Sequence, residues 1–201
     1  MRLRAPAIVL AARPHAETGS IARFMTEEAG LVAGYVAGGR GRRLRPVLLP
    51  GNRVALELSA RASTQLPFAR VELVESRAPF LGEPMIASAV GWIAALTAAC
   101  LPEGNPYPAV YQALDGLLAA VCAAPSARAW LPALITYERL LLRELGYGSS
   151  RLPIPDDMAE QVALFAAQGR AIAQYLLADT RADVMAAREM LVARLQRTTG
   201  G

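Results

Sequence analysis

The sequence predicts an α+β protein in which a small five-stranded β-barrel precedes an all-α domain. Over residues 1–77, short apolar runs with a period of two alternate with turn residues. Beyond residue 80, apolar residues recur every three or four positions, as they do on helices. Charge changes at the same point: residues 1–77 hold 12 arginines and 6 acidic residues, against 9 and 11 afterwards. We therefore expect a barrel domain over 1–79 and a helical domain over 80–201.

The predicted strands are short and evenly spaced. They cover Ile8–Leu10, Ile21–Thr26, Leu31–Ala37, Arg53–Arg61 and Ala69–Leu73. The fourth has the clearest alternation, because Val54, Leu56 and Leu58 fall on one face and more polar residues on the other. Five strands in fewer than 80 residues match the size of an oligonucleotide/oligosaccharide-binding (OB) fold. The sequence therefore predicts an OB barrel.

The predicted helices begin and end at recognisable capping residues. The first covers Pro84–Pro102, the second starts near Pro106 or Pro108, and the third covers Leu131–Leu145 and stops at Gly146. The fourth follows the capping pair Asp157 and Glu160 and runs to about Leu177. The last follows the capping pair Thr180 and Asp183. We expect Thr198–Gly201 to be frayed. Each segment is amphipathic or wholly apolar, so the helices need partners to bury their apolar faces.

The uncharged segment Pro84–Pro102 is long enough to be considered as a membrane span. Its many alanines are only weakly apolar, and its flanks are Glu83 and Glu103 rather than basic anchors. We therefore expect a buried core helix and no membrane association. Met1–Leu10 lacks the features of a secretory signal, so we expect a cytoplasmic protein.

Composition limits the chemistry that is available. All 21 basic residues are arginine, and the net charge is +4. The two cysteines, Cys100 and Cys122, stand in apolar surroundings without metal-ligand spacing, so we interpret them as buried, inert thiols.

The densest charge in the chain is the segment Gly38–Arg45, here called the arginine loop. It contains Arg40, Arg42, Arg43 and Arg45, with three glycines around them. Guanidinium groups at this density cannot be buried without partners, so the segment must lie on the surface. One interpretation is a solvated charge run. The other is a polyanion-binding loop, because each guanidinium can hold two phosphate oxygens and glycine lets a ligand approach the backbone.

Enzymatic motifs are missing. The single histidine, His15, has no nucleophile motif beside it. Gly38–Gly41 lacks the Lys-Ser/Thr ending of a P-loop and has no βαβ context. Asp156 and Asp157 are better explained as helix capping than as a metal pair. We expect no enzyme, no metal site and no cofactor.

Several segments in register resemble one bacterial family. They are Arg13–Thr18 after Ile8–Leu10, Phe24–Gly30, Gly38–Arg43, Val47–Asn52, Tyr107–Tyr111 and Tyr137–Tyr147. Their order and spacing are similar to those of the recombination-mediator and DNA-repair family RecO. The resemblance implies an N-terminal OB barrel, a C-terminal helical domain and non-enzymatic binding and annealing of single- and double-stranded DNA. It also implies RecR as a partner, contact with the acidic tail of single-strand-binding protein (SSB), and help in loading RecA.

The resemblance also implies which residues bind DNA. The matching basic positions are Arg13, Arg40, Arg42 and Arg43. From charge and strand position we add Arg45, Arg53 and Arg61, and Tyr35 as a possible base-stacking ring.

The sequence departs from the family in three places. The family usually has glycine at Ala16 and a Leu-Gly pair near Leu66-Pro67. Members usually insert a longer lobe after the Gly-Tyr pair, and some bind zinc there through four cysteines. Here Gly148 leads almost directly to the last helices, so we expect no zinc.

Two other interpretations remain open. One is an OB-fold RNA-binding protein, in ribosome assembly or RNA processing, because glycine-arginine loops suit RNA equally well. The other is a protein-interaction scaffold that acts through its helical half, where Arg128, Arg139 and Arg143 are possible contacts for an acidic tail.

Overall fold

The computed structural model describes residues 2–60, 65–148, 152–178 and 183–199. Contacts divide the chain into two compact units. The first comprises Met1–Gly82 with Leu101–Tyr111, and the second comprises Glu83–Cys100 with Gln112–Gly201. The segment Leu101–Tyr111 joins the first unit because Gly104 donates its N–H to the Leu31 carbonyl over 2.8 Å. The expected domain boundary after residue 79 stays a prediction.

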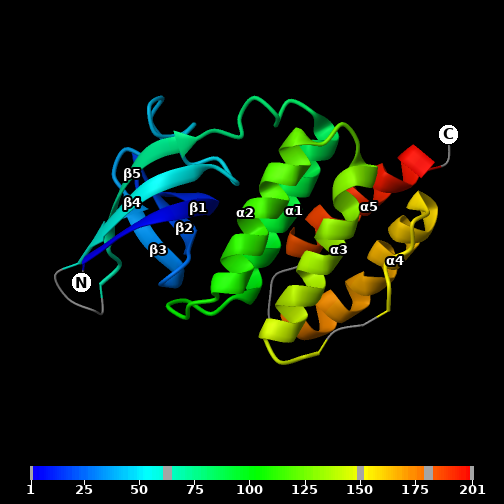
Figure 1. Cartoon of the computed structure of the whole chain (residues 1–201). Helices are drawn as coiled ribbons and strands as arrows, with labels where there is room; N and C mark the ends of the chain where they lie inside the picture. The colour runs from blue at the N-terminus through cyan, green and yellow to red at the C-terminus, as the bar shows by residue number, and fades with distance from the viewer. Residues whose placement is uncertain (1, 61–64, 149–151, 179–182, 200–201) are drawn as a thin grey trace. The chain divides into compact units, whose positions relative to one another are not determined.

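The first unit is a closed barrel of five strands (Figure 1). They are β1 (Arg2–His15), β2 (Gly19–Thr26), β3 (Gly30–Val36), β4 (Arg53–Ser59) and β5 (Phe68–Glu75). Their order around the barrel is β1-β2-β3-β5-β4. All neighbouring pairs are antiparallel except β3 and β5, which pair in parallel at Tyr35 and Phe68 and so complete the ring. The predicted α+β class and five-stranded OB barrel are confirmed.

Strand β1 is much longer than the predicted Ile8–Leu10. Its first half pairs with β4 and its second half with β2, and the register shifts between Val9 and Ala11. One long, bent strand thereby serves both neighbours, as barrel closure requires. The strand continues past the predicted end at Leu10 and includes Pro14, which lies opposite Ser20. The prediction failed because the residues outside the apolar run are exposed, so periodicity does not mark them.

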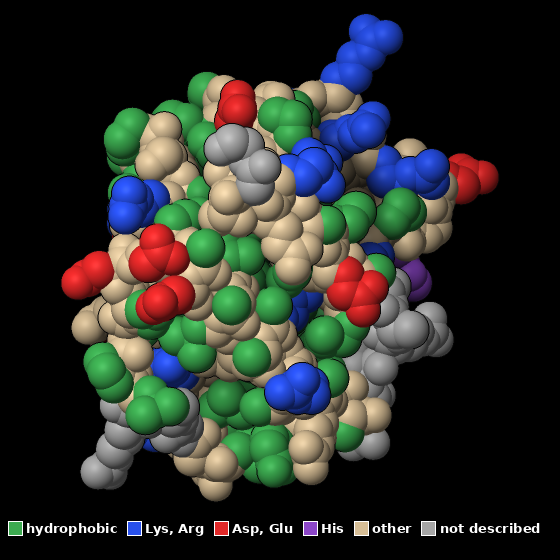
Figure 2. Space-filling model, turned by 90° about the vertical axis from the view of Figure 1, so that its right-hand side faces the viewer, with side chains coloured by type: hydrophobic (Ala, Val, Ile, Leu, Met, Phe, Trp, Pro, Cys, Tyr) green, Lys and Arg blue, Asp and Glu red, His purple; other side chains and the backbone are tan. Residues whose placement is uncertain are grey.

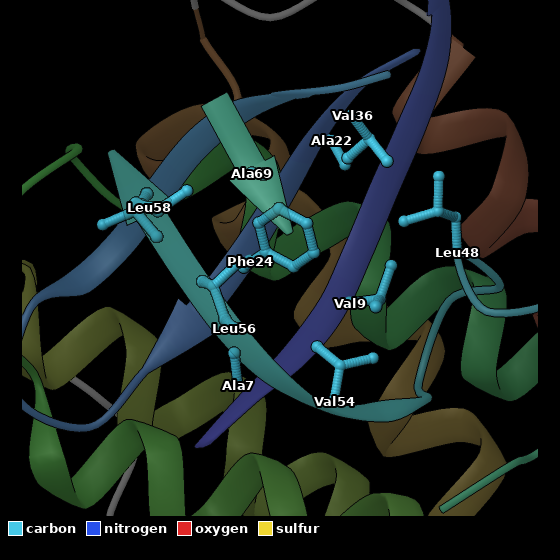
Figure 3. Close-up of a cluster of buried hydrophobic side chains, with 11 residues drawn as sticks. Ala7, Val9, Ala22, Phe24, Val36, Leu48, Val54, Leu56, Leu58 and Ala69 are labelled. Atoms are coloured by element: carbon cyan, nitrogen blue, oxygen red, sulfur yellow. The ribbon is translucent and has the colours of Figure 1, made fainter. Parts of the chain in front are cut away.

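The barrel interior is filled by aliphatic side chains around one aromatic ring (Figure 3). Phe24 is fully buried, and Val54, Leu56 and Leu58 of β4 point inward as their alternation predicted. Gly34 belongs to this packing, since a Cβ atom there would lie 2.8 Å from both the Ala69 Cβ and a Leu58 methyl carbon. Close packing of this kind fixes the strand register, because a shift by one residue would turn the interior side chains outward.

The second unit is helical (Figure 1). Its elements are α1 (Pro84–Cys100), α2 (Pro108–Ala123), α3 (Ala127–Glu144), α4 (Met158–Ala171), the π-helical turn η1 (Ile172–Leu176) and α5 (Asp183–Thr199). The first turn of α2 belongs to the first unit. Helix α1 packs on α5, and α4 packs on α3 and α5.

The helix limits follow the predicted capping residues closely. Asp157 caps α4, because its Oδ1 accepts the N–H of Glu160 over 3.0 Å. Thr180 lies outside the described residues. The expectation of a frayed end was wrong at Thr198 and Thr199, which belong to α5; the Thr198 hydroxyl donates to the Leu195 carbonyl over 2.6 Å.

Helix α1 is the expected core helix. Eight of its residues are buried, among them Trp92, Ile93 and Leu96. No helix within the described residues has the length and hydropathy needed to cross a membrane. Cys122 is buried as predicted, whereas Cys100 is only partly buried, so that part of the prediction was wrong. Desolvation still raises the pKa of the Cys100 thiol to about 12. Cys100 is therefore neutral at ordinary pH, in agreement with the predicted inert thiols.

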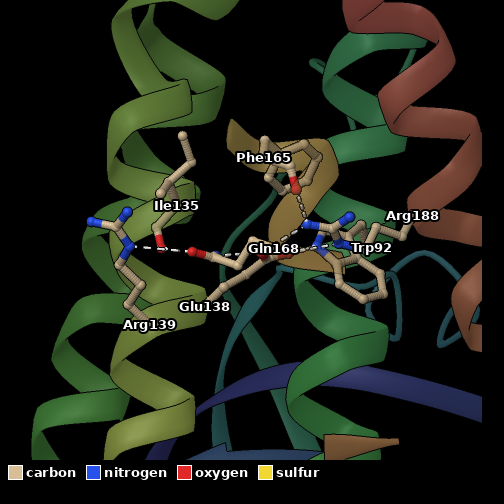
Figure 4. A network of polar contacts seen from close by, with 7 residues as sticks. All are labelled: Trp92, Ile135, Glu138, Arg139, Phe165, Gln168 and Arg188. Carbon is tan, nitrogen blue, oxygen red and sulfur yellow. Dashed lines mark hydrogen bonds and ion pairs between the residues drawn. The ribbon is translucent and has the colours of Figure 1, made fainter. Parts of the chain in front are cut away.

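A buried ion pair joins the helices of the second unit (Figure 4). Glu138 of α3 and Arg188 of α5 are both almost wholly buried, and Arg188 Nε and Nη2 donate to the two carboxylate oxygens over 3.1 and 3.0 Å. Trp92 and Gln168 donate to the same carboxylate. The Arg188 guanidinium lies 4.1 Å from the centre of the Phe165 ring. Four helices thus meet at one carboxylate, so its partners fix how they pack.

Replacing Arg188 with methionine tests this network. The variant leaves the buried Glu138 carboxylate without a cation, which should lower the free energy of unfolding by about 3–5 kcal/mol. Urea denaturation measures the change. The double variant Glu138→Gln with Arg188→Met should recover part of the loss, because no uncompensated charge remains. A loss below about 1 kcal/mol in the single variant would contradict this role.

Alkaline pH should destabilise the second unit. Burial raises the pKa of Cys100 and, more strongly, that of Tyr137, whose hydroxyl is bonded to Thr97. Both groups ionise more readily when unfolded, so their contribution is complete below the unfolded pKa and is lost as pH rises towards the folded pKa. Urea unfolding at pH 10.5 should give a free energy on the order of 2 kcal/mol lower than at pH 8. Cys100→Ala should reduce this dependence; an unchanged profile would show that the thiol ionises freely when folded.

Candidate nucleic-acid interface

The arginine loop lies between β3 and β4 and is a succession of turns. Arg45 N–H donates to the Gly41 carbonyl over 2.9 Å, and Gly38 adopts a positive φ of 68° at the first bend. Leu44 and Leu48 from this connection pack on the barrel core. The apolar residues of the segment thus face the barrel interior, while the intervening arginines face solvent.

Arg40 is hydrogen-bonded to the turn between β1 and β2. Its Nη1 donates to the carbonyls of Ala16 and Glu17 over 3.2 and 2.9 Å, and its backbone N–H donates to the Thr18 carbonyl over 3.0 Å. Its side chain remains exposed. Arg40 therefore joins two loops of the barrel in addition to carrying charge.

Arg42, Arg43 and Arg45 are exposed, as is Arg13 on β1. None of these four makes an ion pair or side-chain hydrogen bond with any described residue. Figure 2, which shows the molecule from the right-hand side of Figure 1, has a group of basic side chains at its upper right, one of which projects beyond the surface. Guanidinium groups without carboxylate partners keep all their donors available for an anion.

The other two predicted arginines differ. Arg53 at the start of β4 is half-buried and lies 3.6 Å from a Glu75 oxygen, so part of its charge is already balanced. The same Glu75 accepts from the buried Arg77 over 2.5 Å. Arg61 lies outside the described residues.

Asn52 positions the segment that directly follows the arginine loop, a role that the sequence reasoning missed. Its side chain is fully buried, and Nδ2 donates to the carbonyls of Pro46 and Val47 over 2.9 and 3.0 Å. Its Oδ1 accepts the backbone N–H of Arg77 over 2.8 Å. A Gly-Asn pair after Pro50 marks a turn in sequence, but burial of the amide becomes visible only in the fold.

The β1–β2 turn keeps a conformation that favours glycine. Ala16 has a positive φ of 54°, the only non-glycine residue in the described chain to do so. The sequence departs from the resembled family at this position, yet the backbone geometry is the one that glycine accommodates without strain.

The aromatic residues of the barrel separate into one buried ring and an external group. Tyr35 is half-buried, and its ring makes edge contacts with His15 at 5.9 Å and Phe68 at 5.5 Å between centroids. Gly19 lies beneath it, since a Cβ there would be 2.4 Å from the Tyr35 ring. Phe68 is 61% exposed, which is unusual for a phenylalanine.

The helical unit has hollows among its described residues. One of about 370 Å³ is lined by Arg128, Trp130, Met85 and Met158 among others, and one of about 330 Å³ by Arg139, Tyr147 and Tyr175 among others. No group of three or more His, Cys, Asp or Glu residues with metal-site geometry occurs in the described part of the chain.

Replacing Asn52 with alanine tests its positioning role. Two loop carbonyls and one N–H would lose their partner, and we expect a loss on the order of 3 kcal/mol in the free energy of unfolding. Chemical denaturation followed by circular dichroism measures it. An effect smaller than that of an exposed substitution such as Ser59→Ala would show that water replaces the amide.

Replacing Ala16 with glycine should remove the cost of a left-handed alanine. We expect a gain of up to about 1 kcal/mol in the free energy of unfolding, reduced by the greater entropy of glycine in the unfolded chain. Thermal unfolding of the wild type and of the Ala16→Gly variant measures this difference in stability. A loss of stability in the variant would contradict the assigned backbone conformation.

Comparison with known proteins agrees with this architecture. The family model "Recombination protein O N terminal" matches residues 1–77, and "Recombination protein O C terminal" matches residues 86–150. A DNA repair protein RecO from Phenylobacterium zucineum is 38% identical over 149 residues, which are 74% of this chain and 60% of that protein. Its counterpart in Rhodospirillum centenum is 41% identical over 143 residues, or 71% of this chain and 56% of the relative.

A longer match occurs with the DNA repair protein RecO of Gluconacetobacter diazotrophicus, at 32% identity over 177 residues, which are 86% of this chain and 70% of that protein. The chain spans 60% and 56% of the length of the first two relatives. Both family models match in their natural order, and they cover the barrel and the first three helices. The chain belongs to the RecO family.

Proposed function

We propose that this protein is a non-enzymatic, DNA-binding and strand-annealing mediator of DNA repair and recombination. The observation that carries the proposal is a set of exposed barrel arginines without an ion pair or side-chain hydrogen bond to any residue that the structure describes: Arg13, Arg42, Arg43 and Arg45. Three of these arginines belong to the arginine loop. Hydrogen bonds from Arg40 within it and from Asn52 after it hold this part of the backbone in place. Family membership supports DNA repair as the setting, because the relatives carry that name.

The mechanism is electrostatic. Arginines that contact phosphates release counterions from the strand, and this release drives binding without regard to sequence. A protein that neutralises two strands at once lowers their mutual repulsion and brings them together. Base pairing then supplies the free energy of annealing, so no nucleotide hydrolysis is needed. The proposed DNA contacts are Arg13, Arg40, Arg42, Arg43 and Arg45, with smaller contributions from Arg53 and Arg61.

The proposal extends to partners in the cytoplasm. We include single- and double-stranded DNA, RecR and the acidic tail of SSB, with RecA loaded indirectly on SSB-coated strands. The hollow beside Arg128 supports a tail contact, because apolar walls formed by Met85, Trp130 and Met158 stand next to a guanidinium group. An acidic tail with apolar residues suits that combination.

Two alternatives remain. An RNA-binding role would use the same arginines, since both nucleic acids present phosphates. Competition between DNA and RNA oligomers of equal length and sequence distinguishes the two, and a clear preference for RNA would favour the alternative. A scaffold role would depend on the helical unit alone. It is favoured if substitution of the barrel arginines leaves both the capture of an acidic-tailed partner and the binding of single-stranded DNA unchanged.

The salt dependence of binding tests the proposal directly. Converting Arg42, Arg43 and Arg45 to alanine should reduce the slope of log affinity against log salt on single strands by about 2, the value for three lost phosphate contacts. The matched control converts Arg170, Arg194 and Arg197 of the helical unit, which removes the same charge. Fluorescence anisotropy at several salt concentrations measures both slopes. An equal effect in the two variants would indicate net charge rather than the loop.

A further inference from the structure

The outer face of the barrel carries a continuous row of side chains that the arginine loop does not explain. In register across the strands, Arg13 pairs with Ile21, Ile21 with Tyr35 and Tyr35 with Phe68. The row continues through Ser59 to Arg2. Residues opposite one another in paired strands point to the same side of a sheet. We call this set the outer row.

The outer row faces away from the core. The sequence neighbours Ala22, Val36 and Ala69 all belong to the interior cluster, so alternation places Ile21, Tyr35 and Phe68 on the outside. Neighbouring strands are about 4.8 Å apart, so the three strands that carry these side chains span roughly 10 Å. Two rings at the centre of the row are therefore presented to solvent between two arginines.

The geometry of the rings is fixed by the fold. The Tyr35 and Phe68 rings make an edge contact at 85°, with 5.5 Å between centroids, and the His15 and Tyr35 rings make another at 78°. Gly19 leaves space for the Tyr35 ring across β2. Phe68 remains 61% exposed in spite of its contact with Tyr35. Exposure of a large apolar ring to water is unfavourable in free energy unless a ligand covers the ring.

Charge identifies the ligand. The row holds no acidic residue, and Arg13 and Arg2 at its ends have no ion-pair partner among the residues described. Arg40 of the arginine loop is bonded to the turn that follows His15, so the row and the loop are continuous on the barrel. A ligand must therefore present flat, apolar faces together with negative charge at both ends. Unpaired bases of a single strand do so, whereas a duplex hides its base faces by stacking.

We infer that the outer row is a base-stacking site for unpaired nucleotides, with Phe68 as the main platform, Tyr35 and His15 supporting it, and Arg13 and Arg2 on the flanking phosphates. This inference rests on the proposed function and adds a second element to it. The arginine loop binds any polyanion, and the outer row discriminates single strands from duplexes. Stacking accepts every base, so little sequence preference follows.

The test compares a single-stranded oligonucleotide with an abasic oligomer of the same length, which keeps the phosphates and lacks the bases. Wild-type protein should bind the strand with bases more tightly by between about fivefold and a hundredfold, the range for one stacked base. Phe68→Ala should remove most of this difference and leave the salt slope unchanged. Val74→Ala is the matched control, because Val74 is an equally exposed apolar residue of β5 outside the row. Circular dichroism confirms that both variants are folded.

The outcomes separate the two proposals. If the wild type binds both oligomers equally and remains salt-dependent, the outer row does not stack bases, while the arginine loop keeps its role. If the wild type binds neither oligomer, the proposed function itself fails. If Phe68→Ala instead changes the molecular mass in light scattering and leaves the preference for bases intact, the row is a contact between copies of the chain and the inference is overturned. A preference for RNA with loss of stacking in Phe68→Ala supports the row and reassigns the nucleic acid.

Discussion

The four arginines that stand within six residues are carried by a segment that is tied to the barrel on both sides. The repulsion between like charges favours an extended loop, and side-chain hydrogen bonds oppose it. Arg40 bonds the carbonyls of the β1–β2 turn, and Asn52 bonds those of Pro46 and Val47. Leu48 anchors the same connection in the barrel core. These contacts lower the conformational entropy that an anion would otherwise remove on binding, so they preorganise the surface for phosphate.

The proposed interface combines two kinds of physical interaction. Phosphate contacts by free guanidinium groups are long-ranged and weaken with salt, whereas stacking on a ring is short-ranged and depends little on salt. On this barrel the two are adjacent, because Arg40 connects the loop to the turn next to His15. Annealing requires a protein that holds a single strand firmly and releases the duplex once it forms. Stacking contacts that a duplex cannot make give that difference.

Much of the architecture is readable from the sequence, for physical reasons. The alternation of Val54, Leu56 and Leu58 marks β4 because one face is buried, and Asp157 marks the start of α4 because an N-cap needs a short acceptor. The length of β1 is not readable, since its exposed ends are not apolar. Charge density located the arginine loop correctly between the third and fourth strands. It did not separate Arg40, which is bonded to carbonyls, from Arg42 and Arg43, which have no side-chain partner within the described part of the chain.

Other features depend on contacts between distant residues and so have no local signature. The Glu138–Arg188 pair joins helices 50 positions apart, and nothing near either residue indicates a buried partner. Phe68 lies just before the predicted fifth strand, Ala69–Leu73, and its exposure becomes visible only from its register with Tyr35. The role of Asn52 likewise arises from closure of the barrel around it.

The most direct test of this account is hydrogen–deuterium exchange of the whole chain with and without a saturating single-stranded oligonucleotide. The account predicts that protection appears in the arginine loop, in the turn after β1 and at the start of β5. Protection confined to helices of the second unit, with unchanged exchange over residues 37–51, would contradict it.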